Sequence, residues 1–88
     1  MQIRVLLFAQ VREIVGSDSV EIAIEEQSVT PLAIRQKVAQ VADADQDLTA
    51  LLERCMVAID NEYCMDVNQE FNVKESMELA IIPPISGG

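Results

Sequence analysis

Residues 78–88 read ELAIIPPISGG, a short apolar strand that runs directly into a proline pair and then a glycine pair. Side chains of a strand alternate between the two sides of a sheet, and here both sides would be apolar. Pro83 and Pro84 have no backbone N–H to donate, so the strand ladder must stop there and the chain must leave the sheet. The sequence therefore predicts a folded domain over residues 1–82 and an extended tail over residues 83–88.

The tail ends in Gly87 and Gly88, which have no Cβ and can pass through a channel too narrow for any other residue. We expect Gly88 to be the carboxyl terminus, and its α-carboxylate to be a group that reacts once it is activated as a mixed anhydride. The tail spans about 20 Å when extended, and the proline pair reduces the entropy lost when it is threaded into a site. The segment that we predict to insert into a partner comprises Pro83, Pro84, Ile85, Ser86 and Gly87.

Fifteen acidic residues against six basic residues give the chain a formal net charge of −9. Binding to nucleic acid needs clustered Lys and Arg, so this balance argues against nucleic acid and favours a partner with a basic surface. The apolar runs are too short to span a membrane. No basic stretch with a cleavage site precedes the first strand, so we expect a single cytoplasmic domain without a membrane partner.

The chain has no histidine and two cysteines, Cys55 and Cys64. Their spacing is not that of a zinc site, and without histidine most hydrolytic and metal-dependent mechanisms lose their usual base or ligand. We therefore expect no metal site, and we expect both cysteines to be small apolar residues in or near the core.

The first third of the chain predicts two strands with a short helical turn between them. Residues 3–7 alternate as a strand with one face in the core, and residues 9–15 form a helical turn that Gly16 closes. Residues 20–25 alternate as a second strand, half buried. Their short connection predicts that the two strands pair antiparallel.

Thr30 and Pro31 predict the start of a helix, because a hydroxyl N-cap is followed by proline at the first helical position. The helix should end near Ala42, with a core stripe made by Ile34, Val38 and Val41. An acidic loop over residues 43–47 leads to a short second helix, whose apolar stripe comprises Leu48, Leu51, Leu52 and Cys55.

The rest of the chain predicts short elements: a strand at 56–59, a turn at Asp60-Asn61-Glu62, a short strand at 63–65, a loop over 66–76 anchored by Phe71 and Val73, and the last strand at 78–82. This order is typical of an α+β domain in which one main helix packs across one face of a mixed sheet.

Strand alternation puts Phe8 and Ile82 on the sheet face opposite Leu7 and Ile81. An apolar patch on the uncovered side of a sheet usually marks a protein contact, although a cluster shielded by loops is the alternative. The residues that we predict to form this interface are Leu6, Phe8 and Ile82, with Cys64 or Met65.

Two segments carry a resemblance to a known family. Residues 6–16 (LLFAQVREIVG) and residues 82–88 (IPPISGG) resemble the small, MoaD-type subunits of molybdopterin synthase, which belong to the ubiquitin-like β-grasp superfamily. The resemblance covers essentially the whole chain. One departure is that Ser76-Met77 stands where the family commonly has a Gly-Asp turn before the last strand, and the segment ahead of it is longer than usual.

The resemblance implies a β-grasp fold with a flexible Gly-Gly tail and a role as sulfur carrier in molybdenum cofactor biosynthesis. An E1-like enzyme would use ATP to adenylate Gly88, and sulfur would then replace AMP to leave a thiocarboxylate. The tail would insert into the large subunit of molybdopterin synthase and donate sulfur to cyclic pyranopterin monophosphate. The resemblance further implies a heterotetramer of two small and two large subunits, no permanently bound cofactor, and a chain that is not catalytic alone.

Three alternatives stay open at this point. A thiamine-pathway sulfur carrier shares the fold and the thiocarboxylate, but typically is shorter and lacks the proline pair. A ubiquitin-like modifier would use the same adenylated glycine to form isopeptide bonds to lysines. A plain interaction domain would have no chemistry at its carboxyl terminus.

Overall fold

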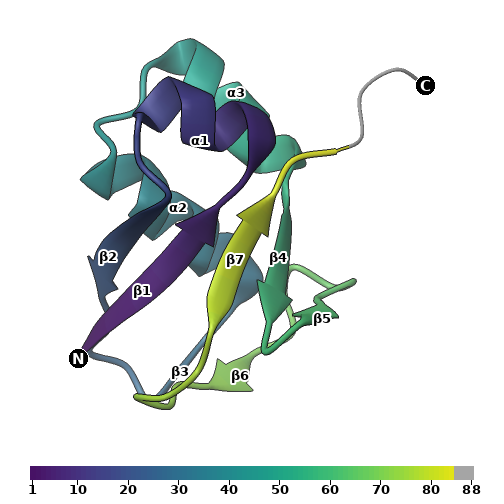
Figure 1. The fold of residues 1–88 in the computed structure, drawn as a ribbon. Helices are drawn as coiled ribbons and strands as arrows, with labels where there is room; N and C mark the ends of the chain where they lie inside the picture. Colours follow the sequence, from purple (N-terminus) through teal and green to yellow (C-terminus); the bar gives the residue numbers. More distant parts are fainter. Residues whose placement is uncertain (85–88) are drawn as a thin grey trace.

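The computed structural model describes residues 1–84, and in this part of the chain a five-stranded sheet is covered by three helices (Figure 1). The elements are β1 Gln2–Leu7, α1 Ala9–Val15, β2 Ser19–Ala23, β3 Ser28–Val29, α2 Pro31–Val41, α3 Gln46–Arg54, β4 Met56–Ile59, β5 Glu62–Tyr63, β6 Phe71–Asn72 and β7 Leu79–Ile82. No helix among these residues is long and apolar enough to cross a bilayer.

The main sheet is mixed, as predicted, with the strand order β2-β1-β7-β4-β5. β1 pairs antiparallel with β2 and parallel with β7, and β7 pairs antiparallel with β4. The last strand therefore lies in the centre of the sheet, between the first strand and β4. β7 is hydrogen-bonded to a neighbouring strand along both of its edges. The tail therefore starts from the centre of the sheet, at a position that two strands hold in place.

The three helices bury a common apolar cluster against one face of the sheet. α2 is the main helix that the sequence predicts, at 11 residues, and α1 and α3 extend its cover. The alternating residues of β1 that point into this cluster are almost completely buried, as expected for the core side of a strand. Among residues 1–84 the most buried members of the core are Ile3, Val5, Leu7, Val11, Ile22, Ile24, Ile34, Val38, Leu52, Val57, Leu79 and Ile81.

Local capping explains where the helices begin and end. The Thr30 hydroxyl accepts a hydrogen bond from the Ala33 N–H at 3.1 Å, and Pro31 follows as the first helical residue, as predicted. Gly16 closes α1 with a left-handed φ of 82°, also as predicted. The start of α3 is a cap that the sequence reasoning missed: the Asp45 carboxylate accepts from the Leu48 N–H at 2.8 Å.

The prediction that Val41 belongs to the core stripe of α2 is wrong, because its side chain is 52% exposed. Val41 is the last residue of α2, and the chain turns immediately after it through Asp43, whose φ is +52°. This turn directs Ala42 and Ala44 toward the core in place of Val41.

The turn between β4 and β5 is a two-residue loop, Asp60-Asn61, with φ values of 49° and 71°. Both residues tolerate left-handed backbone, which two-residue hairpin loops require. Because the loop is this short, Glu62 already belongs to β5, and the short strand is Glu62–Tyr63 instead of the predicted 63–65. Met65 lies beyond it and is 83% exposed.

A second, two-stranded sheet of β3 and β6 was also missed. Each strand has two residues, too few for a periodic pattern, so residues 66–76 were predicted as loop throughout. The predicted anchors Phe71 and Val73 do pack against the core.

Candidate functional site

The tail begins at the carboxyl end of β7. β7 ends at Ile82, and the following Pro83 is buried while Pro84 is exposed. The chain leaves the sheet at this end, on the far side from the N-terminus (Figure 1). The predicted insertion residues Ile85, Ser86 and Gly87, and the predicted reactive Gly88, lie outside the described residues. The roles assigned to Pro83 and Pro84 stay predictions.

The sheet face opposite the helices carries an apolar hollow beside this exit. Strand register aligns one row of residues across four strands: Leu6, Ala80, Ala58 and Tyr63. Around this row lies a hollow of about 210 Å³ whose lining residues are Leu6, Phe8, Ala58, Asn61, Tyr63, Glu78, Ala80 and Ile82. We call it the apolar socket.

The structure thus brings together three residues that the sequence predicts as an interface: Leu6, Phe8 and Ile82. Phe8 is 43% exposed, whereas the preceding Leu7 is 2% exposed, as their alternation implies. Leu6 and Ile82 are half-buried. Their role in partner binding stays a prediction.

Phe8 owes its position to an abrupt change from strand to helix. It is the N-cap of α1 with extended backbone, so it continues the alternation of β1. The next residue, Ala9, has a φ of +50°, a left-handed conformation that costs an L-residue about 1 kcal/mol. The left-handed residue begins α1 directly after the strand and leaves the Phe8 ring beside the tail exit.

Cys64 and Met65 are not brought to the apolar socket. They line a separate hollow of about 150 Å³ with Ile59, Asp66, Gln69 and Phe71. Cys64 directly follows Tyr63, and its N–H donates to the Val57 oxygen at 2.8 Å, so strand alternation turns its side chain away from that of Tyr63. Burial, with a smaller effect of Glu62, raises the pKa of the Cys64 thiol, which is the opposite of activation as a nucleophile.

The environment of Cys55 also does not activate its thiol as a nucleophile. It is 3% exposed, and its Sγ donates to the Leu51 oxygen at 3.2 Å. Burial raises the pKa of this thiol to about 11, against an opposing effect of Arg35 and Arg54. Neither cysteine is poised as a thiolate at neutral pH, and the expectation that both serve as small apolar residues is consistent with this environment.

The other end of the same sheet face is acidic. A hollow of about 580 Å³ is lined by Gln2, Arg4, Leu6, Glu21, Glu75, Ser76, Met77 and Glu78, and it shares Leu6 and Glu78 with the apolar socket. Glu21 pairs with Arg4 in the β1–β2 register. Among its described lining residues, Arg4 is the one basic side chain against three carboxylates. We call these carboxylates, Glu21, Glu75 and Glu78, the acidic strip.

The sequence pattern predicted three of the eight residues that line the apolar socket and missed five: Ala58, Asn61, Tyr63, Glu78 and Ala80. Ala80 shares the parity of Ile82 and could have been included from the strand pattern. Ala58, Asn61 and Tyr63 could not have been predicted, because they reach the site only through the pairing of β4 with β7 and of β5 with β4. No pattern in a single sequence specifies which strand pairs with β7.

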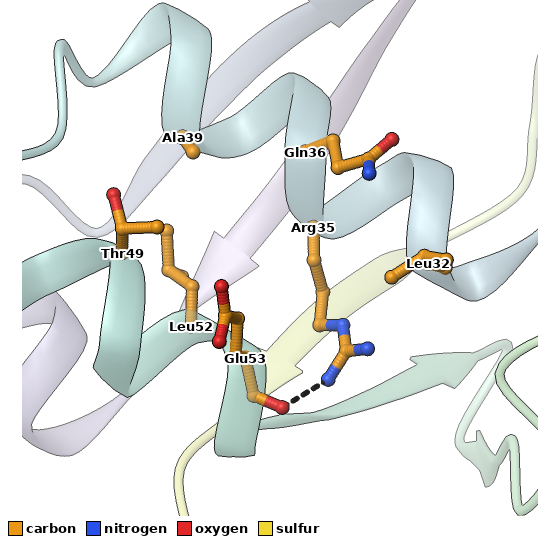
Figure 2. Close-up of a pocket in the computed structure, with 7 residues that line it drawn as sticks. All are labelled: Leu32, Arg35, Gln36, Ala39, Thr49, Leu52 and Glu53. Carbon is orange, nitrogen blue, oxygen red and sulfur yellow. Dashed lines mark hydrogen bonds between the residues drawn. The ribbon is translucent and has the colours of Figure 1, made fainter.

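A fourth hollow, of about 150 Å³, lies between α2 and α3 (Figure 2). Its lining residues are Leu32, Arg35, Gln36, Ala39, Thr49, Leu52 and Glu53. The Arg35 guanidinium donates to the backbone oxygens of Glu53 and Cys55, at the end of α3, which is a helix-capping arrangement. Its one cationic side chain, Arg35, is engaged in this capping arrangement, and its lining has no carboxylate pair, so we assign the hollow to structure. Among residues 1–84 no group of three or more His, Cys, Asp or Glu is placed to hold a metal.

Comparisons with known proteins agree with this architecture. The model of the ThiS family matches residues 5–88. The chain is 37% identical over 86 residues to the molybdopterin synthase sulfur carrier subunit of Escherichia coli, covering 98% of this chain and 99% of that one.

Two solved structures share the fold over the full length of both chains. One is small archaeal modifier protein SAMP1 from Haloferax volcanii, with a TM-score of 0.71 and 21% identity. The other is the complex of subunits 1 and 2 of molybdopterin-converting factor from Helicobacter pylori, with a TM-score of 0.60 and 16% identity. At these identities the likeness concerns the ubiquitin-like β-grasp fold alone.

Proposed function

Because the chain belongs to the ThiS family, and within it to the molybdopterin synthase sulfur carrier subunits, we propose that it carries sulfur as a thiocarboxylate on Gly88. The observation that carries the proposal is that the family match runs to Gly88 and therefore includes the whole tail.

The proposed cycle uses the carboxylate of Gly88 and no side chain of this chain. The carboxylate attacks the α-phosphorus of ATP, pyrophosphate leaves, and an acyl-adenylate forms. Hydrosulfide released by a sulfur donor then adds to the activated carbonyl and displaces AMP, which leaves a thiocarboxylate. The absence of histidine from the sequence and the protonated state of both thiols fit a carrier whose partners supply every acid and base.

We propose two partners for this cycle. An E1-like enzyme binds ATP and adenylates Gly88, and the large subunit of molybdopterin synthase accepts the loaded tail in a heterotetramer of two small and two large subunits. There the thiocarboxylate sulfur passes to cyclic pyranopterin monophosphate, and water restores the carboxylate. A dithiolene contains two sulfurs, so two loaded chains are consumed per molybdopterin. We propose that this ATP-consuming cycle takes place in the cytoplasm.

We propose that both partners dock on the apolar socket, through Leu6, Phe8 and Ile82. These residues lie on the sheet face that the helices leave uncovered, and an uncovered apolar face beside a reactive segment is suited to protein contact. Buried Pro83 fixes the start of the tail against the domain, so a partner that holds the socket also fixes the direction in which the tail enters its site.

The test is the intact mass of the chain after incubation with an E1-like enzyme, ATP and a sulfur source. We expect a gain equal to the replacement of one oxygen by sulfur, and no gain in a variant that lacks Gly88. The matched control is a variant with a conservative change far from the tail, such as Gln36→Glu, which should be loaded normally. Lysine conjugates on a gel in place of the mass gain would overturn the proposal in favour of a protein modifier.

A further inference from the structure

The hollow that Cys64 and Met65 line lies on the other side of the sheet from the apolar socket. Strand register pairs Ile59 with Glu62, and alternation puts the Cys64 side chain on the same side as that of Glu62. Ile59 packs against the core under the helices, so this is the helix-covered side, at the edge strand β5 (Figure 1). We call this hollow, lined by Ile59, Cys64, Met65, Asp66, Gln69 and Phe71, the Met65 hollow.

The Met65 hollow offers an apolar surface to a group from outside. Met65 is 83% exposed, the highest value among the large hydrophobic side chains that are exposed in residues 1–84. Cys64 and Phe71 are half-buried, so the hollow opens to solvent. Methionine is unbranched and polarisable, and its side chain adapts to the shape of a bound partner. The volume of the hollow, about 150 Å³, is that of an apolar cavity that holds benzene, so one aliphatic side chain fits.

Carboxylates without cationic partners surround the Met65 hollow. Residues 55–73 contain four acidic residues and no lysine or arginine. Three of the four lie at the hollow: Asp66 lines it, Glu70 is a chain neighbour of two lining residues, and Glu62 pairs with Ile59. We call these three carboxylates the acidic rim.

Neutral groups hold two carboxylates of the acidic rim in place. The Asp66 Oδ1 accepts a hydrogen bond from the Asn68 N–H at 2.9 Å, and the Glu70 Oε1 accepts from the Ser28 hydroxyl at 3.2 Å. By contrast, the ion pairs found within residues 1–84 all involve carboxylates of residues 18–26. The acidic rim therefore keeps its negative charge available to a cation from outside the chain.

This charge selects the kind of macromolecule that the Met65 hollow suits. A second copy of this chain has a formal net charge of −9, and nucleic acids and anionic lipids present phosphates, so the acidic rim repels all three. A protein segment with lysine or arginine residues is attracted. An apolar hollow inside a negative rim therefore calls for one apolar side chain with cations on both sides of it.

We propose that the Met65 hollow is a docking surface for a basic protein segment that inserts one aliphatic side chain between flanking lysine or arginine residues. The aliphatic side chain packs on Met65 and Phe71, and the flanking cations lie against the acidic rim. Because the Met65 hollow and the apolar socket lie on opposite sides of the sheet, occupying the one leaves the other free. The inference goes beyond the proposed function and does not depend on sulfur transfer.

The chain carries its own reporters for a binding test, because its four methionines lie at four different places. Met65 lines the proposed surface, Met77 lines the hollow of the acidic strip, Met1 lines a hollow beside Asn72, and Met56 begins β4. NMR of the full-length chain with ¹³C-labelled methionine methyl groups therefore shows where a peptide probe binds. The probe is Lys-Lys-Leu-Lys-Lys, and its control without the aliphatic side chain is Lys-Lys-Ser-Lys-Lys.

We expect the leucine peptide to shift the methyl signal of Met65 in a saturable way and to leave those of Met1, Met56 and Met77 in place. The serine peptide should bind at least about tenfold more weakly, because it buries no aliphatic side chain. Equal binding of the two peptides would overturn the inference. A shift of the Met77 signal in place of the Met65 signal would also overturn it, by assigning the binding to the acidic strip.

The contribution of the acidic rim is tested by the combined change Glu62→Gln, Asp66→Asn and Glu70→Gln. The asparagine retains an oxygen that can accept from the Asn68 N–H, so this turn is preserved. We expect the leucine peptide to bind at least about threefold more weakly, since exposed ion pairs contribute little individually, and to lose most of its dependence on salt. Unchanged affinity and salt dependence would overturn the inference.

The matched control for charge is the combined change Glu21→Gln, Glu75→Gln and Glu78→Gln, which removes the same formal charge from the acidic strip. The leucine peptide should bind this variant within about twofold of the unchanged chain, because the acidic strip lies outside the proposed surface. Equal weakening by the two combined changes would show that the peptide responds only to the net charge of the chain, and this would overturn the inference.

The outcomes stay separate from those of the proposed function, because the peptide test needs neither ATP nor a sulfur source. Normal sulfur loading of Gly88 with an unmoved Met65 signal would overturn the docking surface alone. A shifted Met65 signal in a chain that gains no sulfur would overturn the proposed function alone. A homodimer in sedimentation that Met65→Ser dissociates would overturn the inference and assign the Met65 hollow to a second copy.

Discussion

Leu7 and Phe8 are adjacent in sequence but lie on opposite faces of the sheet, and replacing each by alanine should separate folding from binding. Leu7 is 2% exposed and belongs to the core under the helices. Phe8 is 43% exposed and lines the apolar socket. We predict that Leu7→Ala destabilises the domain and that Phe8→Ala mainly weakens partner binding.

The size of each effect follows from burial. Truncating a fully buried leucine to alanine costs about 3 kcal/mol, since the lost transfer free energy adds to the cost of the cavity. A chain of this length has a total stability of roughly 4–13 kcal/mol, so Leu7→Ala removes a large part of it. Phe8 is only partly buried and its truncation opens no closed cavity, so the expected loss of stability is about 1 kcal/mol.

Urea denaturation followed by circular dichroism measures the first effect. With an m-value of about 1 kcal/mol/M, the midpoint should fall by about 3 M for Leu7→Ala and by about 1 M for Phe8→Ala. Calorimetry with the large subunit measures the second, and Phe8→Ala should bind at least about tenfold more weakly. Equal destabilisation by the two changes would refute the assignment of faces. Unchanged binding of Phe8→Ala would refute the role of the socket.

Three further predictions concern the stability of the domain. Gly16→Ala should cost about 1 kcal/mol through backbone strain alone, because φ is +82° and an added Cβ meets nothing within 4 Å; a urea midpoint equal to that of the unchanged chain would contradict this. Arg35→Met should cost about 1–2 kcal/mol by removing the donors to the last carbonyls of α3, and Arg35→Lys should not fully restore the urea midpoint; complete rescue by lysine would show that charge alone suffices. The pKa of the Cys55 thiol, raised by burial to about 11, implies that the folded state keeps its proton where the unfolded chain has lost it. The free energy of unfolding should therefore fall as pH rises from 9.0 to about 11, by up to about 3 kcal/mol, and the fall should be smaller in Cys55→Ala; parallel pH profiles for the two proteins would contradict it.

Local features of the fold were readable from the sequence wherever a few neighbouring residues decide the conformation. The hydroxyl of Thr30 ahead of Pro31 specifies a helix start, and Gly16 specifies a left-handed helix end, because both depend on groups within one turn. The opposite faces of Leu7 and Phe8 follow from the alternation of a strand. Even here Val41 was misplaced, since a helical stripe does not show where the helix stops contacting the core.

Pairings between distant segments were not readable. β3 and β6 have two residues each and exist only because Ser28–Val29 meets Phe71–Asn72 across more than forty residues of chain. The separation of Cys64 from Phe8 into different hollows likewise depends on β5 ending at Tyr63.

The sequence by itself led to the chemistry proposed for this protein, because Pro83-Pro84 and Gly87-Gly88 act through covalent structure and backbone freedom, whatever the fold around them. Only the tertiary structure decided the surface that accompanies the tail. Ala58 and Tyr63 join Leu6 and Ala80 in one row because β4 pairs with β7 and β5 pairs with β4. The free energy that selects this arrangement comes from burying the opposite, helix-covered face of the same strands, a property of the whole core that no local segment encodes.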